Sequence, residues 1–238
     1  MPEVHISQTG SELVERAAAL VETAAADAIA KRGRFVVSLS GGSTPKRLYS
    51  RLADSDIDWA KAEIFIGDER NVPPDHEESN FGMVRETLLE PAGIDEARVH
   101  RWRTEFADPE IVAENFRKAI AELGEQPRFD LVLLGLGEDC HTASLFPGTA
   151  AVDETVRPAV ANFVPPLEAF RYTITFPLIN SAAMAVFLVS GGAKAEAVAN
   201  VLAAKGPDPV LPATLVRPLM GRTVWLLDTA AARLAESS

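Results

Sequence analysis

The sequence predicts an α/β protein with a doubly wound, mostly parallel sheet that carries helices on both faces. The first reason is that short apolar runs alternate with helical patterns along the chain, which is typical of parallel sheets. The second is size, because 238 residues, 47% of them apolar, can bury a large core within one domain. No repeat, low-complexity tract or convincing linker divides the chain, so we expect a single domain over residues 1–238, although two domains would also fit this length.

The first expected elements are a helix and a buried strand. Residues 11–32 form an Ala-rich amphipathic pattern, which we expect to begin at Ser11 as its cap and to end near Gly33. The run RFVVSLS, residues 34–40, follows directly and is typical of a buried strand. The alternation of helix and strand therefore starts at the N-terminal end.

The remaining elements continue this alternation, with strands expected at short apolar runs and helices where the apolar period is about 3.6 residues. The expected strands are residues 62–67, 129–135, 185–191 and 222–228, and the expected helices are 80–90, 109–123 and 193–204. The segment FRYTITFP alternates like a strand that turns Arg171, Thr173 and Thr175 to one face. The Pro-containing stretches 71–75, 157–166 and 205–218 are expected to be loops.

Composition and charge exclude several classes of protein. The net charge of −11 argues against nucleic-acid binding, because a phosphate backbone is held by many Lys and Arg side chains on one face. The only cysteine, Cys140, cannot form an internal disulfide, which indicates a reducing cytoplasm. The N-terminus has Glu3 and no long apolar stretch, so it resembles neither a signal peptide nor a membrane anchor. We expect a cytoplasmic protein without nucleic-acid or membrane partners, of unknown oligomeric state.

The segments after the strands are where a ligand is expected, because open parallel sheets bind ligands outside the carboxyl ends of their strands. The first such segment, SLSGGSTP, contains Gly41, Gly42, Ser43 and Thr44, followed by a proline that suits the first turn of a helix. Glycines let the backbone approach an anion, and the free N–H groups at the helix start can hold a phosphate together with the two hydroxyls. The segment lacks the Gly-Lys-Ser/Thr ending of a Walker loop. An ordinary capped turn is the alternative.

Charged residues follow two other strands. Asp68, Glu69 and Arg70 come directly after a buried strand. Arg70 could bind a phosphate or polarise a carbonyl group, and Asp68 could orient a hydroxyl or a histidine. Lys194 lies near the start of the last long helix, where it opposes the helix dipole unless it holds an anion together with the N–H groups. The alternative for residues 68–70 is a solvated loop, and the alternative for Lys194 is a surface lysine.

The segment GLGEDCHTASLFPG, residues 135–148, follows the strand FDLVLLG and carries a cluster of reactive side chains. It imitates a dinucleotide fingerprint, but Cys140 occupies the place of the third glycine, and Glu138 and Asp139 would repel a pyrophosphate. We therefore exclude a nicotinamide or flavin site. His141 alone among four histidines sits in a glycine-bounded loop at a strand's carboxyl end, which makes it a candidate general base. The alternative is a histidine that bonds only a backbone carbonyl group.

Taken together, these segments resemble the 6-phosphogluconolactonases within the glucosamine-6-phosphate isomerase and lactonase family. The resemblance rests on SGGSTP, GDERNVP....SN, GLGEDCHTASLFPG, RYTITFP, FLVSGGAK and WLLD, in this order and over nearly the whole chain. It implies a Rossmann-like fold without metal or other cofactor, and a carboxylic ester hydrolase of the oxidative pentose phosphate pathway that acts on 6-phospho-D-glucono-1,5-lactone. It also implies that the sugar phosphate is held by Gly41, Gly42, Ser43 and Thr44, with Arg171 and Lys194 as cationic partners.

The resemblance further implies a catalytic role, since the family's histidine in the HTASLFPG segment is the proposed base of lactone hydrolysis and falls on His141. Our hypothesis is that Asp139 or Asp68 orients His141, and that Arg70 or nearby N–H groups stabilise the charge on the carbonyl oxygen. The family usually has Asp-Gly-His where this chain has a cysteine in the middle position. If that glycine has a positive φ, Cys140 would hold an unfavourable backbone at a cost on the order of 1 kcal/mol.

Four other functions are weighed against lactone hydrolysis. By the same resemblance, the deaminase and isomerase branch places a glutamate before the proline of the histidine loop, and Phe146 at this position cannot relay a proton. A cysteine hydrolase using Cys140 and His141 is disfavoured because adjacent side chains usually point in different directions. A non-catalytic sugar-phosphate sensor would need an output module, and no basic helix-turn-helix pattern is visible. A metal enzyme is disfavoured because residues 76–78 would supply only two ligands.

Overall fold

The computed structural model describes residues 2–235 and contains two sheets of different kinds. The larger sheet has seven strands in the order β1-β10-β9-β6-β2-β3-β5, and all its neighbouring strands are parallel. The smaller sheet has three antiparallel strands in the order β4-β8-β7. The predicted α/β class with a mostly parallel sheet is confirmed.

The strands of the large sheet follow the apolar runs of the sequence. They are β1 (Glu3–Ser7), β2 (Phe35–Leu39), β3 (Ala62–Ile66), β5 (Val99–His100), β6 (Leu131–Leu134), β9 (Met184–Val189) and β10 (Arg222–Asp228). The small sheet consists of β4 (Asp68–Arg70), β7 (Ala159–Val164) and β8 (Ala169–Ile174). Every residue of β2, β6 and β9 is buried, which explains why these strands are nearly continuous apolar runs.

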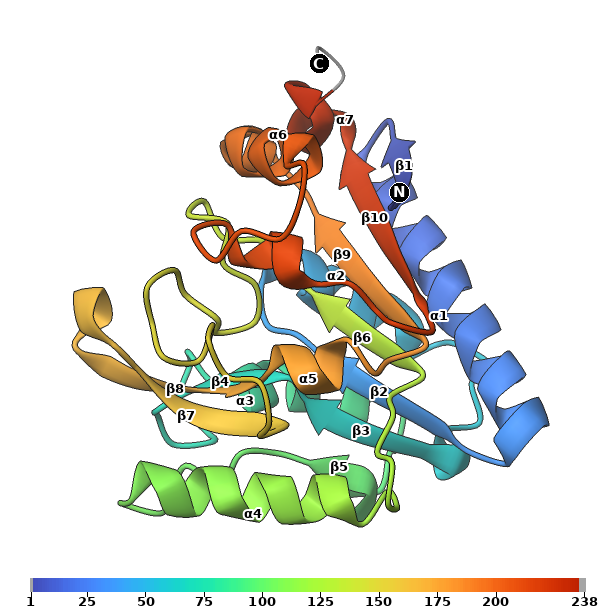
Figure 1. Cartoon of the computed structure of the whole chain (residues 1–238). Helices are drawn as coiled ribbons and strands as arrows, with labels where there is room; N and C mark the ends of the chain where they lie inside the picture. The colour runs from blue at the N-terminus through green and yellow to red at the C-terminus, as the bar shows by residue number, and fades with distance from the viewer. Residues whose placement is uncertain (1, 236–238) are drawn as a thin grey trace.

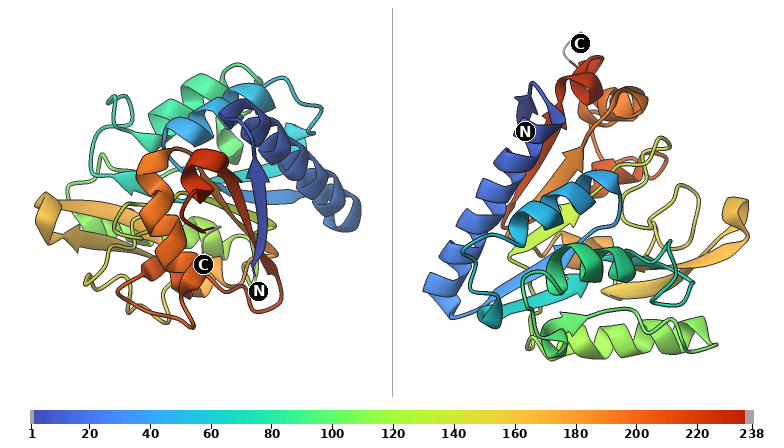
Figure 2. Two further views of the ribbon diagram at one scale, coloured as in Figure 1. Left: turned by 90° about the horizontal axis from the view of Figure 1, so that it is seen from above. Right: turned by 180° about the vertical axis from the view of Figure 1, so that it is seen from behind.

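Helices cover both faces of the large sheet. They are α1 (Gly10–Arg32), α2 (Ser43–Leu52), α3 (Asn80–Val84), α4 (Pro109–Ala121), α5 (Phe176–Ile179), α6 (Ala195–Ala203) and α7 (Thr229–Ala232). Helices α1, α2 and α3 lie on one face (Figure 2), and α5 and α6 lie on the other (Figure 1). Helix α3 continues as a π-helical turn over Arg85–Leu89. Among the described residues, no helix is both long and apolar enough to cross a membrane.

The start of α1 differs from the prediction. The cap is Thr9 and not Ser11, because Oγ1 of Thr9 accepts a hydrogen bond from the backbone N–H of Glu12 at 3.1 Å. The Glu12 carboxylate in turn accepts from the backbone N–H of Gln8 at 2.7 Å, as in a capping box. The Thr9–Glu12 pair therefore stabilises the first turn of the helix. Its predicted end is correct, since Gly33 follows Arg32 with a left-handed φ of 73°.

Four strands, β1, β4, β7 and the two-residue β5, occur where the sequence patterns predicted loops or no element. Residues 157–166 contain β7, because the prolines at 158 and 165 flank this strand and do not interrupt it. Strand β4 has three polar residues, and β1 is a partly exposed edge strand, so neither shows an apolar run. Strand β8 ends before Thr175, which begins α5 instead of continuing the predicted alternation.

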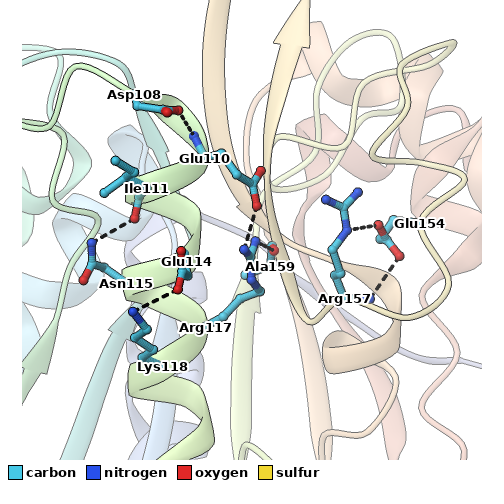
Figure 3. Close-up of polar contacts among 10 residues, drawn as sticks. All are labelled: Asp108, Glu110, Ile111, Glu114, Asn115, Arg117, Lys118, Glu154, Arg157 and Ala159. Carbon is cyan, nitrogen blue, oxygen red and sulfur yellow. Dashed lines mark hydrogen bonds and ion pairs between the residues drawn. The ribbon is translucent and has the colours of Figure 1, made fainter.

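Helix α4 fastens the small sheet to the edge of the large one (Figure 3). The Arg117 guanidinium donates to the carbonyl oxygen of Ala159 in β7 at 3.2 Å and also pairs with Glu110 at 2.6 Å. Just before β7, the Glu154 carboxylate accepts from Nε of Arg157 at 2.5 Å. The beginning of β7 is thus held by side-chain contacts on both sides.

The loops that carry the predicted site all leave the carboxyl edge of the large sheet. Strand β2 pairs with β3 on one side and with β6 on the other, so the direction of the strand order reverses there. Such a reversal is where open α/β sheets bind ligands. The arrowheads of β3, β6 and β9 point toward the side where the loop after β6 and the β7–β8 hairpin lie (Figure 1).

Candidate active site

The predicted phosphate loop joins β2 to α2 and leaves the start of the helix without a side-chain cap. Gly42 is the N-cap residue with φ 113°, a conformation that favours glycine, and it has no side chain to occupy the first N–H groups of α2. Ser43 and Thr44 add two hydroxyl groups at the same end, and Pro45 is buried in the first turn. The helix has ten residues, so its dipole and its free N–H groups can bind an anion.

Gly41 makes room for a side chain from another element. A Cβ atom at Gly41 would lie 1.9 Å from Oδ1 of Asn80, the first residue of α3. This oxygen also accepts from Nη1 of Arg70 at 2.9 Å, and Nδ2 of Asn80 donates to the carbonyl oxygen of Asp68 at 2.8 Å. Asn80 therefore lies where this first loop, between β2 and α2, meets the second loop, which comprises residues 67–80 between β3 and the start of α3. Sequence reasoning gave it no role, and the local signal was the preceding Ser79, a typical helix N-cap.

Two arginines face one another across the small sheet. In the antiparallel pairing of β4 and β8, Arg70 is opposite Arg171 and Asp68 is opposite Thr173. Alternate residues of a strand share a face, so these four side chains lie on one face of the small sheet. Burial, and then the charge of Arg70, lower the pKa of Arg171. Like charges directly opposite one another are unfavourable, so the two arginines suit the negatively charged groups of a ligand.

Asp68 connects the second loop to the histidine loop. Its Oδ2 accepts a hydrogen bond from Oγ of Ser144 at 2.8 Å. Burial raises the pKa of Asp68, while the hydrogen bond from Ser144 and nearby cationic side chains offset part of this effect. The cationic side chains are those of Arg70 and Arg171, and the imidazole of His141 acts in the same direction when it is protonated. The carboxyl group of Asp68 therefore lies among the positive charges of the site.

His141 is in contact with Asp139 and not with Asp68. Its Nδ1 lies 2.5 Å from Oδ1 of Asp139, and the same oxygen accepts the backbone N–H of His141 at 3.2 Å. An ionised carboxylate can only accept, so this pair keeps the proton of the imidazole on Nδ1 and leaves Nε2 as an acceptor. A Cβ atom at Gly137 would lie 2.1 Å from Nδ1 of His141, so glycine makes room for the pair.

The histidine loop is a tight turn with a left-handed residue at its end. The backbone N–H of Cys140 donates to the carbonyl oxygen of Gly137 at 3.1 Å, and that of Gly137 donates to His141 at 2.8 Å. Cys140 has φ 64°, which is the unfavourable backbone expected for a residue in place of glycine. Its side chain is buried, with Sγ 3.8 Å from the carbonyl oxygen of Ala197 in α6. Burial raises the pKa of the thiol, so Cys140 is a poor nucleophile.

Lys194 lies in the loop after β9, at the same edge as the histidine loop because β6 and β9 are parallel neighbours. It ends the 3₁₀ turn Gly192–Lys194 and is partly exposed. The Asp228 carboxylate fixes this loop by accepting from Oγ of Ser190 at 2.6 Å and from the backbone N–H of Gly191 at 3.1 Å. Because the N–H of Gly191 is already bonded, an anion in this loop would rely on the lysine and on the N–H groups that follow.

A cavity of about 400 Å³ opens beside the phosphate loop. Gly42 and Ser43 line it from the first loop, and Arg70 and Asn80 line it from the second. Lys46, in the first turn of α2, adds a positive charge that sequence reasoning did not assign to the site. The structure thus brings the predicted phosphate loop and the predicted arginine to one cavity.

Comparison with known proteins agrees with this arrangement. The family described as glucosamine-6-phosphate isomerases/6-phosphogluconolactonase matches residues 8–225. The chain belongs to this family. The resemblance inferred from the six sequence motifs is confirmed.

Several members of the glucosamine-6-phosphate isomerase/6-phosphogluconolactonase family align with almost the entire chain. A 6-phosphogluconolactonase of Synechocystis sp. is 41% identical over 235 residues, which cover 95% of each chain. The human 6-phosphogluconolactonase is 36% identical over 243 residues and covers 97% of this chain and 93% of its own length. The solved structure of 6-phosphogluconolactonase from Trypanosoma brucei superposes with a TM-score of 0.87, at 31% identity and over 98% of both chains.

Phe146, the residue before the proline of the histidine loop, packs against His141. The position that the resemblance associates with a glutamate in the deaminase branch is Phe146 here, and its ring stacks on the imidazole of His141. The ring centroids are 4.1 Å apart and the planes differ by 29°. An apolar ring therefore covers one side of the imidazole, where it can position the histidine but cannot transfer a proton.

Metal ligands are not gathered in the described part of the chain. No group of three or more His, Cys, Asp or Glu side chains is placed there to hold a metal ion. His76, which was considered as a ligand, instead accepts the backbone N–H of Glu78 through Nδ1 at 3.1 Å. The residues present thus provide acid–base and anion-binding groups.

Proposed function

We propose that this enzyme hydrolyses 6-phospho-D-glucono-1,5-lactone to 6-phosphogluconate, with His141 as the general base. The observation that carries the proposal is the 2.5 Å contact between His141 and Asp139, because it fixes an imidazole with a free Nε2 at the carboxyl edge of the sheet. The relatives from Synechocystis and human, which are named 6-phosphogluconolactonases, support the choice of substrate. The absence of a carboxylate at Phe146 favours hydrolysis over isomerisation.

In the proposed reaction, Nε2 of His141 takes a proton from a water molecule whose oxygen attacks the carbonyl carbon of the lactone. The electron pair of the carbonyl bond moves to its oxygen and forms a tetrahedral oxyanion. When the carbonyl bond re-forms, the bond to the ring oxygen breaks and the imidazolium returns its proton to that oxygen. Asp139 stabilises the imidazolium and keeps the ring in the tautomer that can accept the proton.

The other site residues bind the charged and polar parts of the substrate. Arg70 stabilises the oxyanion, and Asp68 accepts a hydrogen bond from a ring hydroxyl group. The phosphate is bound by the N–H groups and hydroxyls of Gly41, Gly42, Ser43 and Thr44, and by the cationic side chains of Arg171 and Lys194. Binding energy at the phosphate end orients the lactone carbonyl next to His141.

The proposed reaction takes place in the cytoplasm. Cys140 is a free, buried cysteine, which is compatible with a reducing compartment. The phosphorylated substrate is a small intracellular metabolite in this proposal, and no partner protein is needed for the chemistry.

The test is a rapid assay of acid release from freshly prepared 6-phosphogluconolactone, corrected for spontaneous ring opening. The unmodified enzyme should clearly exceed the blank, and His141→Ala should lower turnover by roughly 100-fold or more. Affinity for inorganic phosphate should stay nearly unchanged in His141→Ala, because the imidazole is not part of the phosphate loop. Near-normal turnover by this variant would reject His141 as the base.

Two other outcomes would replace the proposal. Release of ammonia from glucosamine 6-phosphate would assign the chain to the deaminase and isomerase branch. Saturable binding of sugar phosphates, without turnover of lactone or amine, would instead indicate a non-catalytic sensor.

A further inference from the structure

Asn80 makes contacts with both neighbouring loops through one buried amide group. Its side chain accepts from the Arg70 guanidinium at 2.9 Å and donates to the Asp68 carbonyl oxygen at 2.8 Å and to the Asp68 carboxylate at 3.4 Å. Arginine only donates, and carbonyl and carboxylate oxygens only accept, so these partners fix the orientation of the amide. The same amide lies against Gly41, where a Cβ atom would overlap its oxygen.

Glu69 lies between Asp68 and Arg70 in the sequence but points to the opposite face of β4. Its carboxylate is 2% exposed and accepts four hydrogen bonds, three of them from the start of α3. Oε1 accepts the backbone N–H of Asn80 at 2.8 Å, and Oε2 accepts the backbone N–H of Phe81 at 2.9 Å and the hydroxyl of Ser79 at 3.0 Å. Oε1 also accepts the backbone N–H of Arg70 at 2.9 Å.

The two residues therefore form one continuous path of hydrogen bonds. The first N–H groups of a helix have no partners within it, and Glu69 supplies them for α3. This anchors the main chain of Asn80, whose side chain in turn holds Asp68 and Arg70 on the face that looks toward the substrate. A buried carboxylate that no substrate can reach is thus connected to both charged residues of the second loop.

We infer that Glu69 and Asn80 are positioning residues, which act on lactone hydrolysis by holding Asp68 and Arg70 in their working geometry. This inference rests on the proposed function, because it assigns a kinetic consequence to residues that do not themselves react. Removing Asn80 leaves the Arg70 guanidinium with the carbonyl oxygen of Glu78 as its remaining partner. The greater movement of Arg70 then costs stabilisation in the transition state more than it costs binding of the substrate.

The test compares two variants with control variants of the same residue type, or the same charge, outside the site. Asn80→Ala is paired with Asn180→Ala, because the partly buried Asn180 side chain also uses its amide oxygen and nitrogen in hydrogen bonds, to Arg217 and Leu215, but lies outside the site. Glu69→Gln is paired with Asp130→Asn, because Asp130 is a buried carboxylate at the amino end of β6. Unfolding midpoints should fall in all four variants, because each loses hydrogen bonds made by a buried or partly buried side chain.

The kinetic result separates positioning from a structural role. Asn80→Ala and Glu69→Gln should lower kcat by roughly 10- to 100-fold with a smaller change in KM, whereas both controls should stay within about two-fold of the parent. Asn80→Asp should not restore the parental kcat, because its second carboxylate oxygen would face the Asp68 oxygens without a donor. Normal kcat in folded Asn80→Ala and Glu69→Gln would overturn the inference.

A second measurement keeps this inference distinguishable from the proposed function. The guanidinium of Arg70 should show hindered rotation in ¹⁵N NMR spectra of the parent and of Asn180→Ala, and faster rotation in Asn80→Ala. If the parent releases no acid from the lactone, the proposed function fails while the NMR result still reports on the geometry. If Arg70 rotates equally in all three proteins, the positioning inference fails whatever the enzyme's substrate is.

Discussion

Two neighbouring carboxylates in the histidine loop have different surroundings. Both are exposed to solvent, but Asp139 contacts Nδ1 of His141 at 2.5 Å, whereas Glu138 has no such contact with a described residue. Only the first can hold the imidazole in the tautomer that leaves Nε2 free. A substitution of Asp139 can therefore test the role of His141, and a substitution of Glu138 is the control in the same loop.

We predict that Asp139→Asn lowers kcat for lactone hydrolysis by roughly 10- to 100-fold without unfolding the protein. The amide of asparagine can donate to Nδ1, which moves the ring proton to Nε2 and removes the acceptor for the proton of water. Glu138→Gln should retain parental kcat. Steady-state kinetics of the two variants, with circular dichroism to confirm folding, would test this. Equal kcat in Asp139→Asn and the parent would contradict the assigned role.

Single residues also show where sequence reasoning reached its limit. The unfavourable backbone of Cys140 could be predicted, because the family's glycine at that position pointed to a positive φ, and the observed value is 64°. The choice between Asp139 and Asp68 as the partner of His141 could not be predicted, because it depends on how the backbone turn of residues 137–141 closes. Asn80 and Glu69 were missed because their roles depend on the return of α3 to β4, which no local pattern records.

At the level of elements, the buried parallel strands were predictable, whereas the edge strands β1 and β5 and the pairing of the small sheet were not. Strands such as β2 and β6 are buried on both faces, so burial itself is visible as an apolar run. Strand β4 has three charged residues and exists because it pairs with β8, about one hundred positions later in the chain. Pairing between segments that are distant in the sequence leaves no local signal. The position of Arg70 opposite Arg171 results from this pairing, so it could not be predicted from the sequence.

The turn of the histidine loop yields a second prediction, on Gly137→Ala. The added Cβ atom would lie 2.1 Å from Nδ1 of His141 and 2.5 Å from Oδ1 of Asp139, so one of the two side chains must move. Turnover should fall by roughly ten-fold or more, since the pair is no longer held for proton transfer. Gly135→Ala is the control, because a Cβ atom there meets nothing within 4 Å. Equal loss in both variants would indicate a general disturbance of the loop.

At the level of the whole molecule, the ionisation of the Glu154 carboxyl group makes the free energy of unfolding depend on pH. Backbone N–H groups of Arg157 and Val156 and the guanidinium of Arg157 lower the pKa of Glu154 from 4.5 to about 2. The folded state therefore prefers the ionised form, and this contribution is present above pH 4.5 and lost as the pH falls toward about 2. The turn that Glu154 closes leads into β7, so acid should weaken the attachment of the small sheet.

We predict that Glu154→Gln destabilises the protein at neutral pH and that its difference from the parent shrinks as the pH falls from 4.5 toward 2. Urea unfolding midpoints measured at several pH values would show this convergence. Glu125→Gln, at an exposed position, should match the parent throughout. A difference between Glu154→Gln and the parent that stays constant with pH would contradict the assignment.

The two guanidinium groups opposed across β4 and β8 have a practical consequence for anyone who handles this protein. A multivalent counter-ion that settles between them relieves their repulsion in the native state alone, and mass action then raises the melting temperature. Sulfate buffers should therefore protect the protein better than chloride at equal ionic strength, and should also compete with the phosphorylated lactone. Storage conditions and assay conditions will need opposite choices of salt.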